Sequence, residues 1–273
     1  MIEGRPRSVA GPDAGRTEIV GRRRVHCSYH KCLTVYFEKV LKRMVRTPIG
    51  LRGGYRHFNS HLDAFYRDCE EYAVASVNNH VLDLDRFEDV RVTRFVRDPR
   101  DLIVSGYFFH KRSRESWCEV VGPRDADWEV VRGAVPDSLT RRGKRESYRA
   151  YLHEVSLEEG LLAELAFRRH HFESMRAWPK ADPRVELFRY EDVLGREVEV
   201  FDRIFQFYGL PYVTRRIGLH YAHRFRAESF SDRSDHIRDP KMGQWREVFT
   251  PEVTRRFDAE YGDLIEFLGY SRA

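Results

Sequence analysis

The feature that most constrains the fold is a short apolar strand followed directly by a helix start. Residues 90–96 are rich in β-branched and aromatic side chains and predict a strand. Asp98 then suits a helix N-cap, Pro99 the first helical position, and Asp101 the first turn, where a negative charge is favoured. Arg97 is left at the carboxyl end of the strand, beside a helix N-terminus.

The same order of strand and helix occurs twice more. Residues 25–29 and 184–188 predict strands, and apolar positions after each one recur at helical spacing. The helix after the later strand ends at Gly209, with Pro211 beyond it, and a last helix begins at Thr250. Strands that alternate with helices predict an α/β fold with a parallel sheet flanked by helices. Ligands of such sheets bind outside the carboxyl ends of the strands.

The 273 residues are enough to bury a sizeable core, and we expect a single domain. Residues 1–21 are rich in Gly, Pro and Arg and lack periodicity, so we expect a disordered lead-in there. The domain is then expected over residues 22–273, with a charged surface insertion near 111–149.

Composition argues against several classes of protein. No apolar run approaches the ~18 residues of a membrane span, and no apolar stretch of a secretory signal follows the N-terminus, so we expect a cytoplasmic protein. The four cysteines contain no CxxC pair, which argues against a disulfide framework. His57 and His61 stand four residues apart but have no third ligand nearby, so no metal is expected. The net charge of +5 favours an anionic ligand, whereas the scattered Arg runs do not favour nucleic acid.

The first candidate site is the segment from Tyr29 to Tyr36, where a strand passes into a helix. Lys31 supplies a positive charge in the loop, and Thr34 opens the helix with a hydroxyl. Helix N-termini bind anions through their free amides and positive dipole end, so the segment predicts a phosphate site. It contains no Gly and therefore lacks the Walker spacing. Taken alone, a surface lysine before an ordinary helix cap explains it equally well.

Together with the turn at Arg97, this segment resembles the sulfotransferases that use 3′-phosphoadenosine-5′-phosphosulfate (PAPS). That family has a loop of the form Tyr-Pro-Lys-Ser-Gly-Thr-Thr-Trp for the 5′-phosphosulfate. It also has a turn of the form Arg-Asn-Pro-Lys-Asp, with a later Ser, for the 3′-phosphate. Lys31 and Thr34 match the first pattern, and Arg97 and Ser105 match the second. The resemblance implies a P-loop-like sulfotransferase fold and an enzyme that takes PAPS as cosubstrate without a metal.

Two later segments extend the resemblance. Residues 189–192, Arg-Tyr-Glu-Asp, are similar to a family segment whose Tyr contacts adenine, which implies that role for Tyr190. Residues 238–246 are similar to a family motif of the form Arg-Lys-Gly-x-x-Gly-Asp-Trp-Lys, which implies a role for Arg238 at the 3′-phosphate. The cofactor-binding residues implied by the resemblance are Lys31, Cys32, Leu33, Thr34, Val35, Tyr36, Arg97, Ser105, Tyr190 and Arg238.

The chain also departs from the family pattern. His30 replaces Pro, and Cys-Leu at 32–33 replaces Ser-Gly, which puts a side chain where Gly permits unusual φ angles. Tyr36 stands where a Trp often stacks on adenine. Asp-Pro at 239–240 replaces Lys-Gly and removes a positive charge. These changes affect the fine geometry more than the resemblance itself.

The resemblance implies in-line transfer of a sulfuryl group to a hydroxyl or an amine of an unidentified acceptor. Lys31 is placed to stabilise the negative charge that develops on the leaving nucleotide. A base accepts the proton of the acceptor, and in cytosolic members a His upstream of the Arg turn has this role. His80 occupies a comparable place, so we predict Lys31 and His80 as the catalytic residues. The rival bases are His57, His61, Glu70 and Glu71.

Two other functions stay open at this point. An ATP-dependent kinase of the P-loop class would also bind a nucleotide. However, the missing Gly loop counts against it, and Arg97 with Ser105 favours a 3′-phosphate, which ATP lacks. A non-catalytic protein that binds polyanions would show a steep salt dependence and ignore the nucleotide. The sequence leaves the oligomeric state open, and the acceptor is either a small molecule or a glycan.

Overall fold

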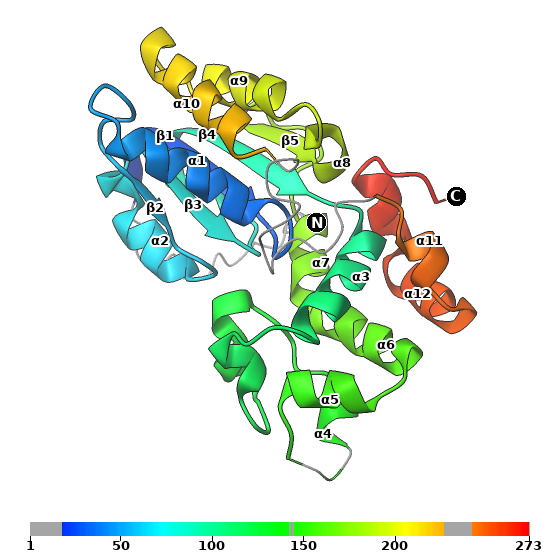
Figure 1. Cartoon of the computed structure of the whole chain (residues 1–273). Coiled ribbons are helices and arrows are strands. Elements are labelled where there is room, and N and C mark those ends of the chain that lie inside the picture. The colour runs from blue at the N-terminus through cyan, green and yellow to red at the C-terminus, as the bar shows by residue number, and fades with distance from the viewer. Residues whose placement is uncertain (1–17, 142, 144, 227–241, 273) are drawn as a thin grey trace, which may run out of the picture.

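The computed structural model describes residues 18–141, 143, 145–226 and 242–272. At its centre lies a five-stranded sheet in the order β2-β3-β1-β4-β5, and every neighbouring pair of strands is parallel (Figure 1). The strands are β1 (Ile19–Ser28), β2 (Tyr55–His57), β3 (Val74–Asn78), β4 (Phe87–Val96) and β5 (Val185–Arg189). The predicted α/β fold with a parallel sheet flanked by helices is confirmed.

Helices surround this sheet, and Figure 1 shows α1, α9 and α10 together over one of its faces. The longer helices are α1 (Thr34–Arg46), α2 (Leu62–Asp68), α3 (Pro99–His110), α5 (Tyr148–Glu154), α6 (Leu157–Phe167), α7 (Arg169–Arg176), α9 (Glu197–Phe207), α10 (Tyr212–Arg224) and α12 (Pro251–Phe267). Single turns form α4 (Asp137–Thr140), α8 (Tyr190–Val193) and α11 (Trp245–Val248). The 3-10 helices are η1 (Cys69–Glu71), η2 (Leu84–Arg86), η3 (Ser116–Glu119) and η4 (Asp125–Val131). Across the described ranges, each helix is too short or too polar to cross a bilayer.

The side chains of β1 alternate between the two faces of the sheet. His26 faces α1 and stacks on Phe37, with the ring centroids 3.7 Å apart. Val25 and Cys27 are buried on the opposite face in a cluster that includes Phe65 of α2. Both faces of this central strand are therefore covered, as is usual for parallel sheets.

β1 begins at Ile19, inside the lead-in predicted for residues 1–21. Residues 1–17 of that lead-in lie outside the described residues. Arg22 lies on the strand, and its Nε donates to a carboxylate oxygen of Asp89 on β4 at 2.6 Å. The neighbouring strand thus supplies acceptors for the Arg-rich segment, which explains why a stretch without apolar periodicity forms a strand.

The charged segment 111–149 folds as short helices around two buried tryptophans. Trp117 of η3 and Trp128 of η4 pack edge to face, with ring centroids 5.7 Å apart. Nε1 of Trp128 donates to the carbonyl of Trp117 at 3.0 Å. Both rings also contact Phe167 at the end of α6. Part of this segment therefore belongs to the core, in the green lower region of Figure 1.

The predicted helix starts before α3 and α12 are confirmed. The Asp98 side chain accepts a hydrogen bond from the amide of Arg100 at 2.9 Å, and Pro99 is the first residue of α3. The Thr250 hydroxyl accepts from the amide of Val253 at 3.3 Å. The first of these caps fixes the turn between β4 and α3, so that Arg97 lies at the carboxyl edge of the sheet.

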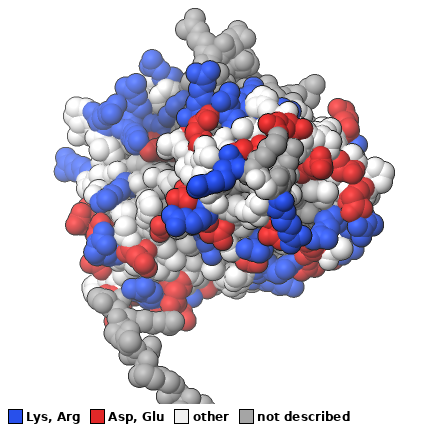
Figure 2. Space-filling model, turned by 90° about the horizontal axis from the view of Figure 1, so that it is seen from below, with Lys and Arg blue, Asp and Glu red and all other residues white. Residues whose placement is uncertain are grey.

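Surface charges mostly occur as short-range pairs. Arg255 and Glu252 approach to 2.6 Å on α12, and Arg141 and Asp137 to 2.9 Å near α4. Figure 2 shows basic and acidic side chains mixed over the face seen from below, with basic ones denser at the upper left. Exposed pairs of this kind contribute little to stability, so the high Arg content is largely a property of the solvated surface.

Candidate active site

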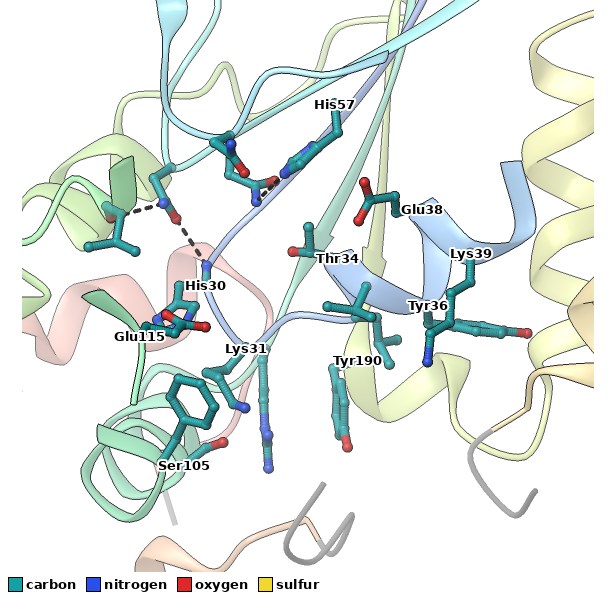
Figure 3. A pocket seen from close by; sticks show the side chains of 18 of the residues that line it. His30, Lys31, Thr34, Tyr36, Glu38, Lys39, His57, Ser105, Glu115 and Tyr190 are labelled. Carbon is teal, nitrogen blue, oxygen red and sulfur yellow. Dashed lines mark hydrogen bonds between the residues drawn. The ribbon is translucent and has the colours of Figure 1, made fainter. Parts of the chain in front are cut away.

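A cavity of about 540 Å³ opens at the carboxyl ends of β1, β3 and β4. Figure 3 shows side chains from the β1–α1 loop, α1, α3 and the start of α8 around it. Of the ten predicted cofactor residues, Cys32 is fully buried and does not line the cavity, and Arg238 lies outside the described residues. The eight that line it are Lys31, Leu33, Thr34, Val35, Tyr36, Arg97, Ser105 and Tyr190.

The loop between β1 and α1 takes a left-handed backbone at two positions. Lys31 has a φ of 74° and Leu33 a φ of 58°. The amide of Cys32 donates to the carbonyl of Tyr29 at 2.9 Å, which closes the turn between them. A β-carbon in this region costs roughly 1 kcal/mol or more. Leu33 therefore preserves the backbone shape that Gly allows in the family pattern, at an energetic cost.

α1 begins at the cavity without an acidic cap. Leu33 occupies the N-cap position and its side chain carries no acceptor, and the first turn contains no acidic residue. Thr34 is the first helical residue, and its hydroxyl lies 2.8 Å from that of Ser28. Amides at such a helix start are suited to an anion, because they carry the positive end of the helix dipole.

Two cations flank this helix start, the half-buried Lys31 and the buried Arg97. Nζ of Lys31 lies 3.8 Å from the ring centroid of Phe109, and the guanidinium of Arg97 lies 4.3 Å from that of Tyr190. Burial lowers the pKa of Lys31 to about 7, and the positive charges of Arg168 and Arg97 add to this effect. An anion held between these groups would raise that pKa again, so the cavity is electrostatically suited to a phosphate or sulfate.

Behind the loop lies a buried polar network, which sequence reasoning did not predict. Nε of Arg168 donates to Glu164 at 3.0 Å, and both side chains are completely buried. Nη1 of Arg168 also donates to the carbonyl of His30 at 3.1 Å. The second carboxylate oxygen of Glu164 contacts His110 Nδ1 at 2.7 Å and accepts from the Tyr148 hydroxyl at 3.1 Å. The network therefore connects α3, α5 and α6 with the β1–α1 loop.

The C-terminal segment joins the site through the first turn of α3. The amides of Gly243 and Trp245 donate to the Asp101 carboxylate at 2.6 and 3.1 Å. The guanidinium of Arg100 lies 3.8 Å from the Trp245 ring centroid, and Gln244 lines the cavity. The last part of the predicted 238–246 motif thus lies beside the Arg97 turn.

A chain of hydrogen bonds leads from Thr34, at the end of the β1–α1 loop, to His57 at the end of β2. Ser28 contacts the Thr34 hydroxyl and donates to Oδ1 of Asn78 at 2.6 Å. Nδ2 of Asn78 lies 3.4 Å from Nε2 of His57, and Nδ1 of His57 lies 2.8 Å from the Ser76 hydroxyl. With the Asn78 amide as donor, the neutral imidazole carries its proton on Nδ1 and its lone pair on Nε2. Burial lowers the pKa of His57, which favours this neutral form.

The structure brings His57, and not His80, to the cavity. β3 ends at Asn78, and Asn79 turns the chain with a φ of 62°. Oδ1 of Asn79 accepts from the amide of His30 at 2.9 Å, whereas Nε2 of His80 contacts the carbonyl of Ser60 at 2.8 Å. His80 is absent from the cavity lining, as are the other proposed rivals, His61, Glu70 and Glu71.

Metal ions and thiol nucleophiles each need a particular arrangement of cysteine and histidine side chains. Within the part of the chain that the structure describes, no three His, Cys, Asp or Glu side chains are grouped to hold a metal ion. All four cysteines are buried with free thiols. Burial raises the pKa of the Cys32 thiol to about 12, so this residue packs behind the loop in its neutral form.

Fold and site together define a parallel α/β protein with a cationic cavity at the carboxyl edge of its sheet. A model of the sulfotransferase domain family matches residues 80–269. The solved structure of mouse sulfotransferase SULT7A1 complexed with PAP is similar to this chain, with a TM-score of 0.52 and 16% sequence identity. That similarity covers 94% of this chain and 88% of the mouse chain, and it concerns the fold.

Two structures of retinol dehydratase are also similar. The complex with retinol and PAP has a TM-score of 0.49 and 15% identity, over 92% of this chain and 83% of that chain. The complex with androsterone and inactive cofactor PAP has a TM-score of 0.47 and 15% identity, over 89% of this chain and 80% of that chain. A search of curated protein sequences finds no significant match.

The family match spans well over half of the chain, and the chain therefore belongs to the sulfotransferase family. The predicted class of enzyme, a PAPS-dependent sulfotransferase, is confirmed. The matched region begins at residue 80 and includes the Arg97 turn but not the loop at Lys31. The role of that loop rests on the geometry described above.

The buried network predicts that Gly106 on α3 cannot be enlarged. A β-carbon at Gly106 would lie 1.9 Å from Oε1 of Glu164, whereas one at Gly262 on α12 would meet its nearest neighbour, Asp258, at 4.0 Å. Gly106→Ala should therefore lower the free energy of unfolding by roughly 2 kcal/mol or more, because the buried ion pair must move. Gly262→Ala should be neutral or should raise it by up to about 1 kcal/mol, through helix propensity.

Urea unfolding of both variants, followed by circular dichroism, measures the difference. Equal stabilities for Gly106→Ala and Gly262→Ala would show that the network has no fixed geometry behind the loop.

Proposed function

We propose that this sulfotransferase binds the PAPS donor with the β1–α1 loop and the Arg97 turn, and transfers its sulfuryl group to an acceptor held beside His57. The observation that carries this assignment is the convergence of two cationic elements on one cavity. Lys31 comes from the β1–α1 loop and Thr34 from the start of α1, and Ser105 comes from α3 (Figure 3). Arg97 follows the last residue of β4 and lines the same cavity. Two anionic ends of one nucleotide match two such elements.

The loop is the proposed site of the 5′-phosphosulfate. The α1 amides supply donors at the positive end of the helix dipole, and the Thr34 hydroxyl is a further donor beside them. The flexible Lys31 side chain supplies a positive charge beside the oxygen that bridges phosphate and sulfate. This charge stabilises the negative charge that develops on that oxygen during transfer. We assign the leaving-group role to Lys31 for that reason.

Arg97 and Ser105 are the proposed partners of the 3′-phosphate. Arg97 is buried against the Tyr190 ring, which restricts the directions in which its guanidinium can donate. Ser105 lines the same cavity from α3. Tyr190 and Tyr36 lie on the adenine side of the proposed nucleotide, and the Tyr36 ring is held by a hydrogen bond from its hydroxyl to the carbonyl of Ala222 at 2.7 Å. Arg238 is a further proposed ligand of this phosphate and lies outside the described residues.

His57 is the proposed general base, in place of His80. Its Nδ1 is fixed by Ser76, and its Nε2 lone pair faces the Asn78 amide at 3.4 Å. An acceptor hydroxyl or amine that displaces this long contact gives its proton to Nε2. The hydrogen-bond chain through Asn78 and Ser28 fixes the His57 ring relative to Thr34 at the start of α1. Transfer then pairs two events: Lys31 stabilises the departing oxygen, and His57 takes the acceptor proton.

Titration with 3′,5′-diphosphoadenosine (PAP) tests the donor site. At pH 8 the Lys31 amine is mostly neutral in the free protein, because its pKa is about 7. A bound phosphate raises that pKa, so PAP binding at pH 8 should take up close to one proton, and binding at pH 6 almost none. Calorimetry in two buffers of different ionisation enthalpy measures this number.

Variants separate the two ends of the nucleotide. Lys31→Ala should abolish the proton uptake and lower turnover, whereas Arg97→Ala should keep the uptake and weaken PAP binding at least tenfold. ADP and ATP lack a 3′-phosphate, so the unaltered protein should bind them more weakly than PAP. The Arg97→Ala variant should bind ADP, ATP and PAP with about equal affinity. Tighter binding of ATP than of PAP would overturn the donor assignment in favour of a kinase.

The assignment of the base predicts a difference between two histidines. His57→Gln should lower kcat by roughly a hundredfold, the usual contribution of a general base. His80→Gln keeps a donor for the Ser60 carbonyl and should leave kcat within about threefold, since it acts at no reacting atom. The measurement is the release of PAP from PAPS with an accepted phenol or alcohol.

The pH profile supplies a second readout for His57. The base must be neutral, so kcat should fall as the pH drops through the His57 pKa, which burial holds below its ordinary value of 6.5. His57→Gln should lose this acidic limb. A large loss in His80→Gln with an unchanged His57→Gln would restore His80 as the base.

A further inference from the structure

A second cavity, of about 400 Å³, lies away from the active site and shares no lining residue with it. Arg94 of β4 lines it together with residues 179–183, which precede β5. Leu187 of β5 and Phe267 at the end of α12 supply apolar walls. The cavity therefore combines one strand-borne cation with a largely apolar lining.

Arg94 is a buried cation without a carboxylate partner among the described residues. Its side chain belongs to a residue only 3% exposed, and its Nε and Nη2 atoms make no hydrogen bond within the described ranges. The guanidinium lies 4.3 Å from the ring centroid of Trp178. Its polar partners are the Tyr29 side chain, with which it makes a hydrogen bond, and the Cys27 thiol. Both are uncharged, because burial raises the pKa of both and that of Cys27 to about 12.

The acidic residue on the cavity wall is already engaged. Asp182 accepts from Arg184 through Nη2 at 2.8 Å and through Nε at 3.1 Å. Lys180 adds a second positive charge to the lining. A buried guanidinium cannot lose its proton at physiological pH, so it needs a hydrogen-bonding anion or water. The apolar walls favour an occupant with an apolar body.

We propose that this second cavity binds a small organic anion, whose carboxylate or sulfate group contacts Arg94 and whose apolar body packs against Leu187 and Phe267. Carboxylates and sulfate monoesters share the chemistry that the guanidinium recognises, namely coplanar acceptor oxygens with a negative charge. The two sources differ in shape and are separated by the test.

Substitutions of Leu187 change the charge of the second cavity and leave the buried core unaltered. It is the Cα partner of Arg94 in the parallel register of β4 and β5, and its side chain is 40% exposed. Side chains paired in this way lie on the same face of the sheet. Leu187→Glu therefore places a carboxylate beside Arg94, and Leu187→Gln is the matched neutral control.

The experiment titrates the full chain with benzoate, with phenyl sulfate and with neutral benzyl alcohol. Trp178 fluorescence and calorimetry both report binding, and saturating PAP is present in one series and absent in a second. Binding of at least one anion, at least tenfold tighter than benzyl alcohol and equal in both series, is expected. The preferred anion identifies the carboxylate or the sulfate ester as the occupant.

Variants decide where the anion binds. Arg94→Met, which keeps the length of the side chain and removes its charge, should weaken binding at least tenfold, and so should Leu187→Glu. Leu187→Gln should stay within threefold of the unaltered protein. Leu187→Glu should also raise the midpoint of thermal unfolding, because it supplies the missing counter-charge.

Three results would overturn the proposal: no saturable binding of either anion, equal affinity for benzyl alcohol, or unchanged affinity in Leu187→Glu. None of them depends on the donor assignment, because Arg97→Ala changes only the first cavity. Anion binding that Arg97→Ala abolishes would place the anion in the nucleotide cavity and would also contradict the second site.

Discussion

The position of the β1–α1 loop depends on the buried ion pair between Glu164 and Arg168. Taking two charges out of water costs several kcal/mol for each ion, and the pair is stable only if further hydrogen bonds satisfy both groups. The Glu164 carboxylate also contacts His110, and Arg168 donates to the backbone carbonyl of His30. These hydrogen bonds stabilise the buried charges and hold the β1–α1 loop in a fixed position. Gly106 has no side chain and leaves the space that the Glu164 carboxylate occupies. The cost is that a positive charge lies permanently behind the site where Lys31 must also be positive.

That crowding of cations couples folding to anion binding. In the folded chain the pKa of Lys31 is about 7, against an ordinary value of 10.5, because of burial and the charges of Arg168 and Arg97. Between these two pH values the unfolded chain binds more protons than the folded one. The contribution of Lys31 to stability therefore rises with pH across this window and is least favourable below pH 7. An anion bound beside Lys31 as proposed would raise its pKa again and so offset this unfavourable contribution.

The part of the site that could be predicted from sequence is the part formed by neighbours in the chain. The Arg97 turn follows from a strand, a cap and a proline within a few residues, and the structure places each as expected. His57 could not be assigned in the same way, because β2 has only three residues and reaches the cavity through the strand order of the sheet. His80 looked suitable by spacing alone. The left-handed turn at Asn79 directs it away. Asn tolerates this conformation better than most residues, but its presence alone does not tell which way the following side chain points. The Glu164 network is similarly invisible, since its members come from four separate elements.

Arg168, Lys31 and Arg94 illustrate three physical outcomes for charge removed from water. Arg168 is neutralised by the carboxylate of Glu164 on the preceding helix, and its charge positions the β1–α1 loop. Lys31 can lose its proton, so its charge becomes conditional on a ligand. Arg94 has no carboxylate partner among the described residues: its guanidinium stays protonated beside the neutral Tyr29 hydroxyl, and the acid on the cavity wall, Asp182, is held by Arg184. A cavity beside such a group is then more than a packing defect, because access to water or to an anion is what makes the buried charge tolerable. A buried positive charge is stabilised by an anion beside it. This argument supports both the proposed phosphate site at Lys31 and the proposed anion site at Arg94.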